Sequence, residues 1–305
     1  AHLRSSGRAG WNVVTSSAGE KNFGLPAIPG QTERYKRALE YVGVVEELWT
    51  SWQPDAIVPE AGGEVRVEPD RVRKINHRGD YYSVEGPLNL PRSVQDRPVL
   101  FQAGSSSDGI DFAARFAEGV YTAQQILGQA QEFYRDLKTR TLHYGRRAEQ
   151  IAILPGLSTV IGDTEADALR LDREIGEATL VPEVWKALSA QLGGIEIDDL
   201  ELDRRVPAER LPEILSVQGR QSRYGVFRHF ALEEGWTLRQ LLHFQATSAG
   251  HGRVVGTPEQ VADHIEHWFR QKAADGFIVM PGQGVGGAEI FASEVVPILR
   301  RRGLY

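Results

Sequence analysis

Three consecutive serines at 105–107 stand where a strand-like run gives way to a helix-like run, and they offer the clearest chemistry in the sequence. The apolar run 98–101 leads to Gly104, and after the serines alanine and phenylalanine recur on one helical face. The first N–H groups of a helix lack partners inside the helix and carry partial positive charge, so hydroxyl residues at this point suit a phosphate. The serines would serve equally well as ordinary helix caps, and the residues alone leave both interpretations open.

The elements that must position these serines alternate along the chain. The segments 32–52 and 126–137 show apolar residues at helical spacing, and strand-like segments occur at 10–16, 97–104, 119–122, 151–161 and 275–281. Such alternation predicts a parallel α/β fold. An open doubly wound sheet and part of an eight-stranded barrel fit this pattern equally well.

Local signals refine this outline. The run Thr257-Pro258-Glu259-Gln260 predicts a helix start with a capping box. The segment 72–84 predicts a hairpin that turns at 78–80, and 180–253, which shows no clear strand, predicts a mostly helical insertion. Since they lie on a helix rich in charge, His264 and His267 are expected to be solvated.

Composition restricts the class of protein. The 305 residues are 41% hydrophobic and 25% charged, which is ordinary for a globular protein with a sizeable core. The net charge of −6 and the scattered basic residues predict no nucleic-acid partner and no membrane partner, and favour a small molecule. Because there is no cysteine, disulfides, thiolate metal sites and cysteine nucleophiles are excluded. With no signal-like or membrane-spanning run, the expected location is the cytoplasm.

Two kinds of motif give no assigned site. The run 282–287 satisfies G-x-G-x-x-G after a strand-like segment, but a dinucleotide site also needs an acid on a second strand, and only 18 residues follow the motif. We therefore expect a flexible glycine loop, with an NAD(P)-binding oxidoreductase as the alternative. No H-E-x-x-H, G-x-S-x-G or P-loop pattern occurs, so no metal site is expected and no catalytic residue is assigned.

Longer stretches carry a family resemblance. The segments SGRAGWNVVTS, KNFG, ERYKRALEYVGVVEELWTSW, VEGPLNLPRSVQDRPVLFQAGSS, FAEGVYTAQ, VGTPEQVADHIEHWF and ADGFIVMP, in this order, resemble the bacterial-luciferase-like flavin monooxygenases. The similar branch holds nitrilotriacetate monooxygenase component A, dibenzothiophene-sulfone monooxygenase and long-chain alkane monooxygenase. The resemblance implies a TIM (β/α)8 barrel, and in most members a homodimer or tetramer.

The resemblance also implies a reaction and its cofactor. Reduced FMN would be supplied by a separate NAD(P)H:flavin reductase, and a flavin C4a-hydroperoxide formed with O2 would transfer one oxygen atom to a small organic substrate. The cofactor-binding positions that the family's motifs match are Asn12 and Thr15 beside the flavin ring, and Tyr35, Gly104, Ser105 and Ser106 at the phosphate.

The substrate side is less defined. The insertion 180–253 should line the pocket, where Arg223, Arg228 and Arg253 would either receive an acidic substrate or be solvated surface residues. His243 and His251 would either face the substrate or serve the structure, and the structural interpretation is favoured.

The sequence departs from the family pattern at its N-terminal end. The sequence begins near the fourth strand of the expected barrel, so we expect one domain over 1–305 that lacks the first three strands. Three explanations stay open: part of a longer protein, missing strands supplied by a partner, or pairing with a second copy. A flavin-binding or scaffold subunit without turnover is therefore kept as an alternative function.

Overall fold

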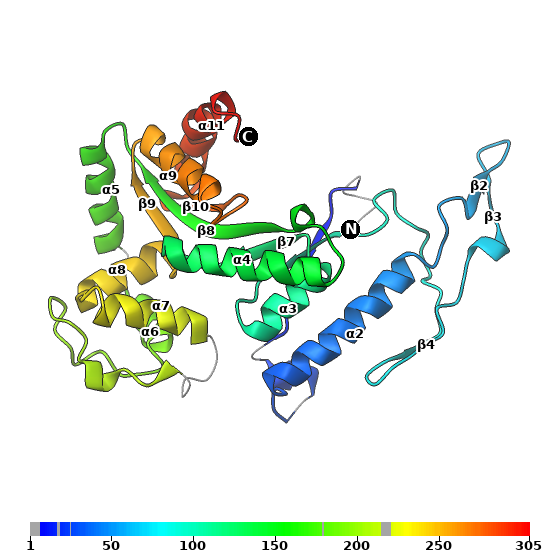
Figure 1. The fold of residues 1–305 in the computed structure, drawn as a ribbon, viewed down its shortest axis with the longest axis horizontal. Coiled ribbons are helices and arrows are strands. Elements are labelled where there is room, and N and C mark those ends of the chain that lie inside the picture. Colours follow the sequence, from blue (N-terminus) through cyan, green and yellow to red (C-terminus); the bar gives the residue numbers. More distant parts are fainter. Residues whose placement is uncertain (1–6, 17–18, 25, 179, 215–220) are drawn as a thin grey trace. The chain divides into compact units, whose positions relative to one another are not determined.

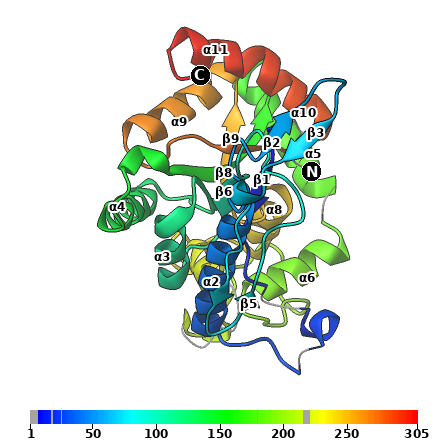
Figure 2. The same cartoon turned by 90° about the vertical axis from the view of Figure 1, so that its right-hand side faces the viewer.

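The computed structural model describes the chain except residues 1–6, 17–18, 25, 179 and 215–220. It divides into two compact units, residues 1–119 and residues 120–305, whose ribbons are drawn in Figures 1 and 2. Each unit contains parallel strands with helices between them, which confirms the α/β class that the sequence predicts.

Unit 1 is built on two parallel strands, β1 (Gly10–Asn12) and β6 (Val99–Gln102). Asn12 lies opposite Phe101 in the register of this pair. Both strands are shorter than predicted, but they lie within the predicted ranges. Because parallel strands end at the same edge, the residues that follow β1 and those that follow β6 emerge together there.

Two helices cover this pair and supply the core of unit 1. Helix α2 (Gln31–Trp49) packs against helix α3 (Ser107–Phe116), as Figure 1 also shows. Apolar residues recur at helical spacing on α3, so one face of this helix is buried. The buried members of the core are Val13, Val42, Leu100 and Phe112.

Two hairpins and two short helical turns complete unit 1. The predicted hairpin is present, with β4 (His77–Arg78) antiparallel to β5 (Ser83–Val84). A second hairpin, β2 (Ile57–Pro59) with β3 (Val65–Val67), was not predicted, because each strand has only three residues, too few for a recognisable pattern. The short turns are η1 (Glu20–Phe23) and η2 (Pro69–Arg71).

Unit 2 is organised around strand β8 (Ala152–Ile161), which pairs with β7 (Gly119–Thr122), β9 (Gly252–Gly256) and β10 (Ile278–Pro281). The pairings with β9 and β10 are parallel. Every residue of β8 from position 155 onward is buried, which explains its nearly continuous apolar sequence. Strand β9 was not predicted, because its glycines at both ends and its length of five residues give too short a pattern.

Several helices of unit 2 pack into two groups. Within 180–253, three helices pack against one another around Leu188, Phe227 and Leu241, and Figure 1 shows them gathered together. At another end of the unit, α9 packs against α11, as Figure 2 shows. The helical elements of unit 2 are α4 (Leu127–His143), η3 (Ala148–Gln150), α5 (Glu165–Ala178), α6 (Pro182–Gln191), η4 (Ala208–Arg210), α7 (Gln221–Leu232), α8 (Leu238–Ser248), α9 (Pro258–Arg270), α10 (Gly284–Ile290), the π-helical η6 (Phe291–Val295) and α11 (Val296–Arg301).

Helix α9 begins as the sequence predicts, with Thr257 as N-cap and a complete capping box formed with Gln260. The expectation for one of its histidines is wrong. His264 stacks on Trp268 with ring centroids 5.4 Å apart, and burial lowers the pKa of His264 to about 4. His264 is therefore part of the packing, whereas His267 is exposed as expected.

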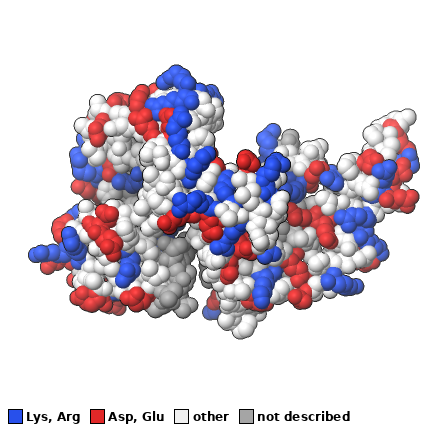
Figure 3. All heavy atoms as spheres, viewed as in Figure 1, with Lys and Arg blue, Asp and Glu red and all other residues white. Residues whose placement is uncertain are grey.

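Charges of both signs are interspersed over the face drawn in Figure 3. Lysine and arginine form no continuous stripe of the kind that tracks a polyanion on that face. Within the described residues, no helix combines the length and the apolar character that a membrane crossing requires.

Candidate functional site

The serine turn joins the end of β6 to the start of α3, as the sequence predicts. Ser106 is the N-cap of α3, and its Oγ accepts a hydrogen bond from the backbone N–H of Gly109 at 3.2 Å. The capping interpretation therefore holds for Ser106. It does not exclude a ligand, because a serine that accepts with its oxygen still has its own O–H to donate. Ser105, the preceding residue, is partly buried.

Tyr35 reaches this turn from α2. Its hydroxyl lies 2.7 Å from the point that a Cβ on Gly104 would occupy, and 2.9 Å from the point that a Cβ on Gly109 would occupy. Its ring packs edge-on against Phe112, with centroids 5.4 Å apart. Tyr35 is thus both a core residue and a hydroxyl directed at the turn, and glycine at 104 and 109 leaves the room that this hydroxyl needs.

Gln102 fixes the shape of the turn and was missed by sequence reasoning. Its side chain is buried, and its Oε1 accepts a hydrogen bond from the backbone N–H of Gly104 at 2.6 Å. Because the N–H of Gly104 already has a partner, the role of this glycine is to leave room for the side chains of Tyr35 and Gln102. The signal was a polar residue at a buried strand position directly before the Ala-Gly pair. We call Tyr35, Gln102, Gly104, Ser106 and Gly109 the hydroxyl cradle.

A negative charge stands in the first turn of α3. The carboxylate of Asp108 accepts a hydrogen bond from the Oγ1 of Thr32, at the start of α2, at 3.1 Å. A carboxylate here stabilises the helix through its dipole, and it also opposes the arrival of a second anion.

The two other predicted residues lie at the neighbouring strand end. Asn12 is the exposed last residue of β1. Thr15 lines a pocket of about 540 Å³ in unit 1. Arginine and tyrosine side chains form much of its polar wall, and these are Arg34, Arg37, Tyr41, Tyr81 and Tyr82. The structure therefore brings Tyr35, Gly104 and Ser106 together and leaves Asn12 and Thr15 at the adjacent part of the same edge.

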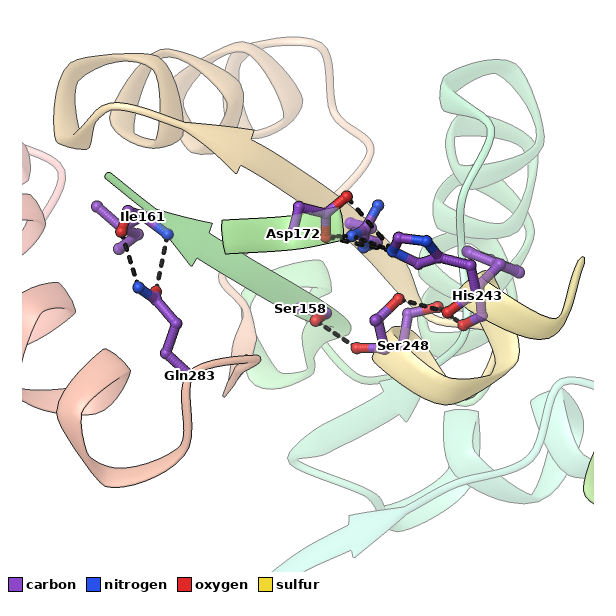
Figure 4. Close-up of polar contacts among 9 residues, drawn as sticks. Ser158, Ile161, Asp172, His243, Ser248 and Gln283 are labelled. Carbon is purple, nitrogen blue, oxygen red and sulfur yellow. Dashed lines mark hydrogen bonds and ion pairs between the residues drawn. The ribbon is translucent and has the colours of Figure 1, made fainter. Parts of the chain in front are cut away.

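A charged cluster in unit 2 joins α5, α8 and β9 (Figure 4). Arg253 forms an ion pair with the buried Asp172, and its Nη2 lies 3.1 Å from the Nε2 of His243. The same Nε2 also lies 3.4 Å from the carboxylate of Asp172, and burial lowers the pKa of His243, which favours its neutral form. Burial also lowers the pKa of Arg253 to about 10, which leaves it charged at neutral pH. Arg253 and His243 are therefore tied to Asp172 and to each other within unit 2.

The glycine motif at 282–287 also has a structural function, and the prediction that it forms a flexible loop is wrong in part. Its second half begins α10 at Gly284. Gln283 accepts from the backbone N–H of Ile161 and donates to the carbonyl oxygen of Ile161, both at 2.9 Å, as Figure 4 shows. The motif thus continues the hydrogen bonding of β8 beyond β10. Across the described residues, no group of three or more histidine or carboxylate side chains is arranged to hold a metal.

Comparison with known proteins gives one family. The sequence profile described as luciferase-like monooxygenase matches residues 2–276. N-acetyl-S-(2-succino)cysteine monooxygenase of Bacillus subtilis (strain 168) is 40% identical over 100% of this chain and 68% of its own length. Nitrilotriacetate monooxygenase component A of Aminobacter aminovorans is 39% identical over 98% of this chain and 66% of its own length.

Solved structures give the same result. A riboflavin lyase solved with modified FMN and riboflavin superimposes with a TM-score of 0.81 at 31% identity, over 98% of this chain and 65% of that one. The enzyme DmoA of Hyphomicrobium sulfonivorans superimposes with a TM-score of 0.80 at 30% identity, over 97% of this chain and 62% of that one. The chain thus spans about two thirds of the length of the proteins it resembles, and its strands correspond to part of their barrel.

Proposed function

Because this chain belongs to the luciferase-like monooxygenase family, we propose that its hydroxyl cradle binds the phosphate of reduced FMN within a two-component monooxygenase. That enzyme would insert one atom of O2 into a small organic substrate. A separate NAD(P)H:flavin reductase would supply the reduced flavin, in line with a relative that is named as a component A.

The observation that supports this proposal most is the position of the Tyr35 hydroxyl over two glycines. Oη of Tyr35 and Oγ of Ser106 are placed at the N-terminus of α3, a helix of ten residues. Hydroxyl donors and a helix N-terminus together form a site for a phosphate monoester. Residue 104 must be small because both Tyr35 and Gln102 approach it. The residues present therefore fit the phosphate of FMN.

The remaining contributions follow from the strand edge. Asn12 and Thr15 follow the neighbouring strand, where we propose that they donate to, or accept from, the polar side of the flavin ring. Bound reduced FMN would supply the activation of O2. The chain needs no nucleophile of its own for that reaction, since its task is to bind, orient and exclude water.

The test compares Tyr35→Phe with Tyr305→Phe, which alters an exposed tyrosine that does not line the pocket of Thr15. Anaerobic titration with reduced FMN and with reduced riboflavin measures both affinities. We expect Tyr35→Phe to weaken FMN binding about tenfold, because a hydrogen bond to a charged group is lost, and to leave riboflavin binding unchanged. Equal loss for both flavins would place the Tyr35 hydroxyl away from the phosphate.

Turnover needs its own measurement. Oxygen uptake with FMN, NADH and a flavin reductase should rise when a suitable organic substrate is added. Uptake that yields only hydrogen peroxide with every substrate would favour the alternative of a flavin-binding subunit without turnover. Tight NADH binding in the absence of flavin would instead favour the nicotinamide alternative.

The relatives' names leave the substrate class open. They include N-acetyl-S-(2-succino)cysteine and nitrilotriacetate, but also dibenzothiophene sulfone, long-chain alkanes and dimethyl sulfide. The first two compounds are organic acids and the others are neutral. Choosing between an acid and a neutral compound therefore requires an observation on this chain.

A further inference from the structure

The pocket of unit 1 that Thr15 lines also contains two arginines from α2. Arg34 and Arg37 lie one turn apart on this helix, and both line the pocket of about 540 Å³. The Nη1 of Arg34 donates to the carbonyl oxygen of Pro29 at 2.6 Å, and its Nε is buried without a hydrogen-bond partner among the described residues. Within the same part of the chain, neither guanidinium forms an ion pair with a carboxylate.

The β4–β5 hairpin holds Arg37 in place. The Oη of Tyr82 accepts from the Nε of Arg37 at 2.9 Å, and the guanidinium carbon lies 5.6 Å from the centroid of the same ring. The backbone N–H groups of Tyr81 and Tyr82 donate to the carboxylate of Glu40 on α2 at 3.0 Å and 2.8 Å, which fixes the hairpin against the helix. Arg37 makes no other hydrogen bond to the described residues, so both of its Nη groups can donate to a ligand.

The pocket wall also contains the carboxylate of Glu33, which is bonded to a tyrosine. A hydrogen bond with Glu33 raises the pKa of Tyr81, so this phenol keeps its proton at neutral pH and donates to the carboxylate. Glu33, Arg34 and Arg37 together leave one positive charge in excess. The apolar members of the wall are Val14, Ile28, Pro29 and Ala38. The pocket therefore suits a compound that joins an anionic group to an apolar body.

This pocket is separate from the hydroxyl cradle. Because successive residues of an α-helix are about 100° apart, Tyr35 and Arg37 stand about 200° apart and point to opposite sides of α2. Accordingly, Tyr35 packs against Phe112 of α3, whereas Arg37 contacts the hairpin. An anion bound in the cradle would therefore not serve as the counter-ion of Arg37.

We propose that Arg37, together with Arg34, binds a carboxylate of the organic substrate, so that the substrate is an organic acid. The identification of this ligand as the substrate rests on the proposed function. A carboxylate can accept two parallel bonds from one guanidinium, and the second guanidinium adds charge one turn away. Since Thr15 lines the same pocket, the bound acid would lie beside the position that we propose for the flavin ring.

The arginines that the sequence offered for an acidic substrate lie in unit 2 instead, and each contacts another side chain there. These contacts join Arg253 to Asp172, Arg228 to Glu213 and Arg223 to His251. Two of the three partners are carboxylates, which already supply the counter-charge. The arginines of the unit 1 pocket differ because a neutral tyrosine and a carbonyl oxygen are their partners.

The experiment titrates the full chain calorimetrically with N-acetyl-S-(2-succino)cysteine, with nitrilotriacetate and with the trimethyl ester of each. We expect at least one acid to bind the unaltered protein, and to bind Arg37→Gln about tenfold more weakly or worse, since a charge-assisted contact is lost. The control is Lys36→Gln, which removes an exposed positive charge from the same helix outside the pocket and should stay within about twofold. Arg37→Lys, which keeps the charge but not the planar fork, should fall between them. Melting curves check that all variants fold.

Three results would overturn the proposal: equal affinity of Arg37→Gln and Lys36→Gln for the acid, a preference for the ester, or no binding of either acid to the unaltered protein. Titration of the same variants with reduced FMN and reduced riboflavin supplies a fourth. If Arg37→Gln lost affinity for FMN but not for riboflavin, the arginines would serve the flavin phosphate and the proposal would be wrong. Loss of acid binding in Arg37→Gln, in a protein that binds no flavin, would uphold the carboxylate site and reject the monooxygenase assignment.

Discussion

Helices α3 and α9 both begin with a hydroxyl residue as N-cap, but only α9 completes a capping box there. In α9, the Oγ1 of Thr257 accepts from the backbone N–H of Gln260 at 3.3 Å, and the Gln260 side chain accepts from the backbone N–H of Thr257 at 2.9 Å. In α3, Ser106 accepts from the backbone N–H of Gly109, but Gly109 has no side chain to return the bond. Helix α8 follows the α9 pattern, with Thr237 and Gln240.

The difference lies in one residue, the third of each helix. A glutamine there closes the box, so the first turn of α9 satisfies its own backbone groups. A glycine there leaves the box open, and the hydroxyl of Tyr35 takes the space beside it. A closed helix start contributes to stability alone, whereas an open one lined by glycine can also meet a ligand. The predictions below are ways to test that distinction.

The largest effect is expected from Gly104→Ala. The added methyl group would lie 2.4 Å from the Nε2 of Gln102 and 2.7 Å from the hydroxyl of Tyr35, so both side chains must move. We expect FMN affinity to fall by well over tenfold, and the free energy of unfolding to fall by about 1–3 kcal/mol as for other overpacked sites. Titration with reduced FMN and urea denaturation measure the two changes.

Gly43→Ala is the control for that change. Gly43 lies on α2, and nothing stands within 4 Å of an added methyl group. Alanine there should raise the free energy of unfolding by up to about 1 kcal/mol and leave FMN affinity unchanged. If Gly104→Ala bound FMN as well as Gly43→Ala does, the cradle would not be the phosphate site.

A pair of cap variants tests the comparison directly. Ser106→Ala and Thr257→Ala each remove one hydroxyl acceptor from a helix start, so each should lower the free energy of unfolding by about 1 kcal/mol. Only Ser106→Ala should also weaken FMN binding, by roughly fivefold to tenfold, because only that hydroxyl has a ligand to meet. Equal FMN affinity in the two variants would mean that the N-terminus of α3, like that of α9, does not bind the phosphate of FMN.

The features that could be predicted from the sequence depend on contacts between residues close together in the chain. The Thr257-Pro258-Glu259-Gln260 run gave the α9 start because all of its partners lie within four residues. The serine turn was predicted for the same reason, and its capping bond spans three residues. The same Thr-x-x-Gln signal stands at Thr237, where the start of α8 was not predicted.

What sequence could not show depends on contacts between distant positions. The contact of Tyr35 with Gly104 spans 69 residues, and the ion pair of Asp172 with Arg253 spans 81. No spacing rule relates such pairs, so the sequence could not show that Arg253 is held by Asp172. The family resemblance supplied Tyr35, but Gln102 emerged only from the packing.

The smallest effect is expected from Asp108→Asn. Its carboxylate stands in the first turn of α3 and accepts from Thr32, so it competes electrostatically with a phosphate at the same helix start. Removing one negative charge that is partly exposed should strengthen FMN binding about twofold to threefold at low salt and less at high salt, because salt screens electrostatic interactions. The helix itself should lose a few tenths of a kcal/mol of stability, since a favourable dipole interaction is removed.

The control is Asp111→Asn, one turn further along α3, which should change FMN affinity less. Titrations at two salt concentrations measure both variants, and a loss of FMN affinity in Asp108→Asn would indicate that this carboxylate orients the turn through Thr32 instead of opposing the phosphate.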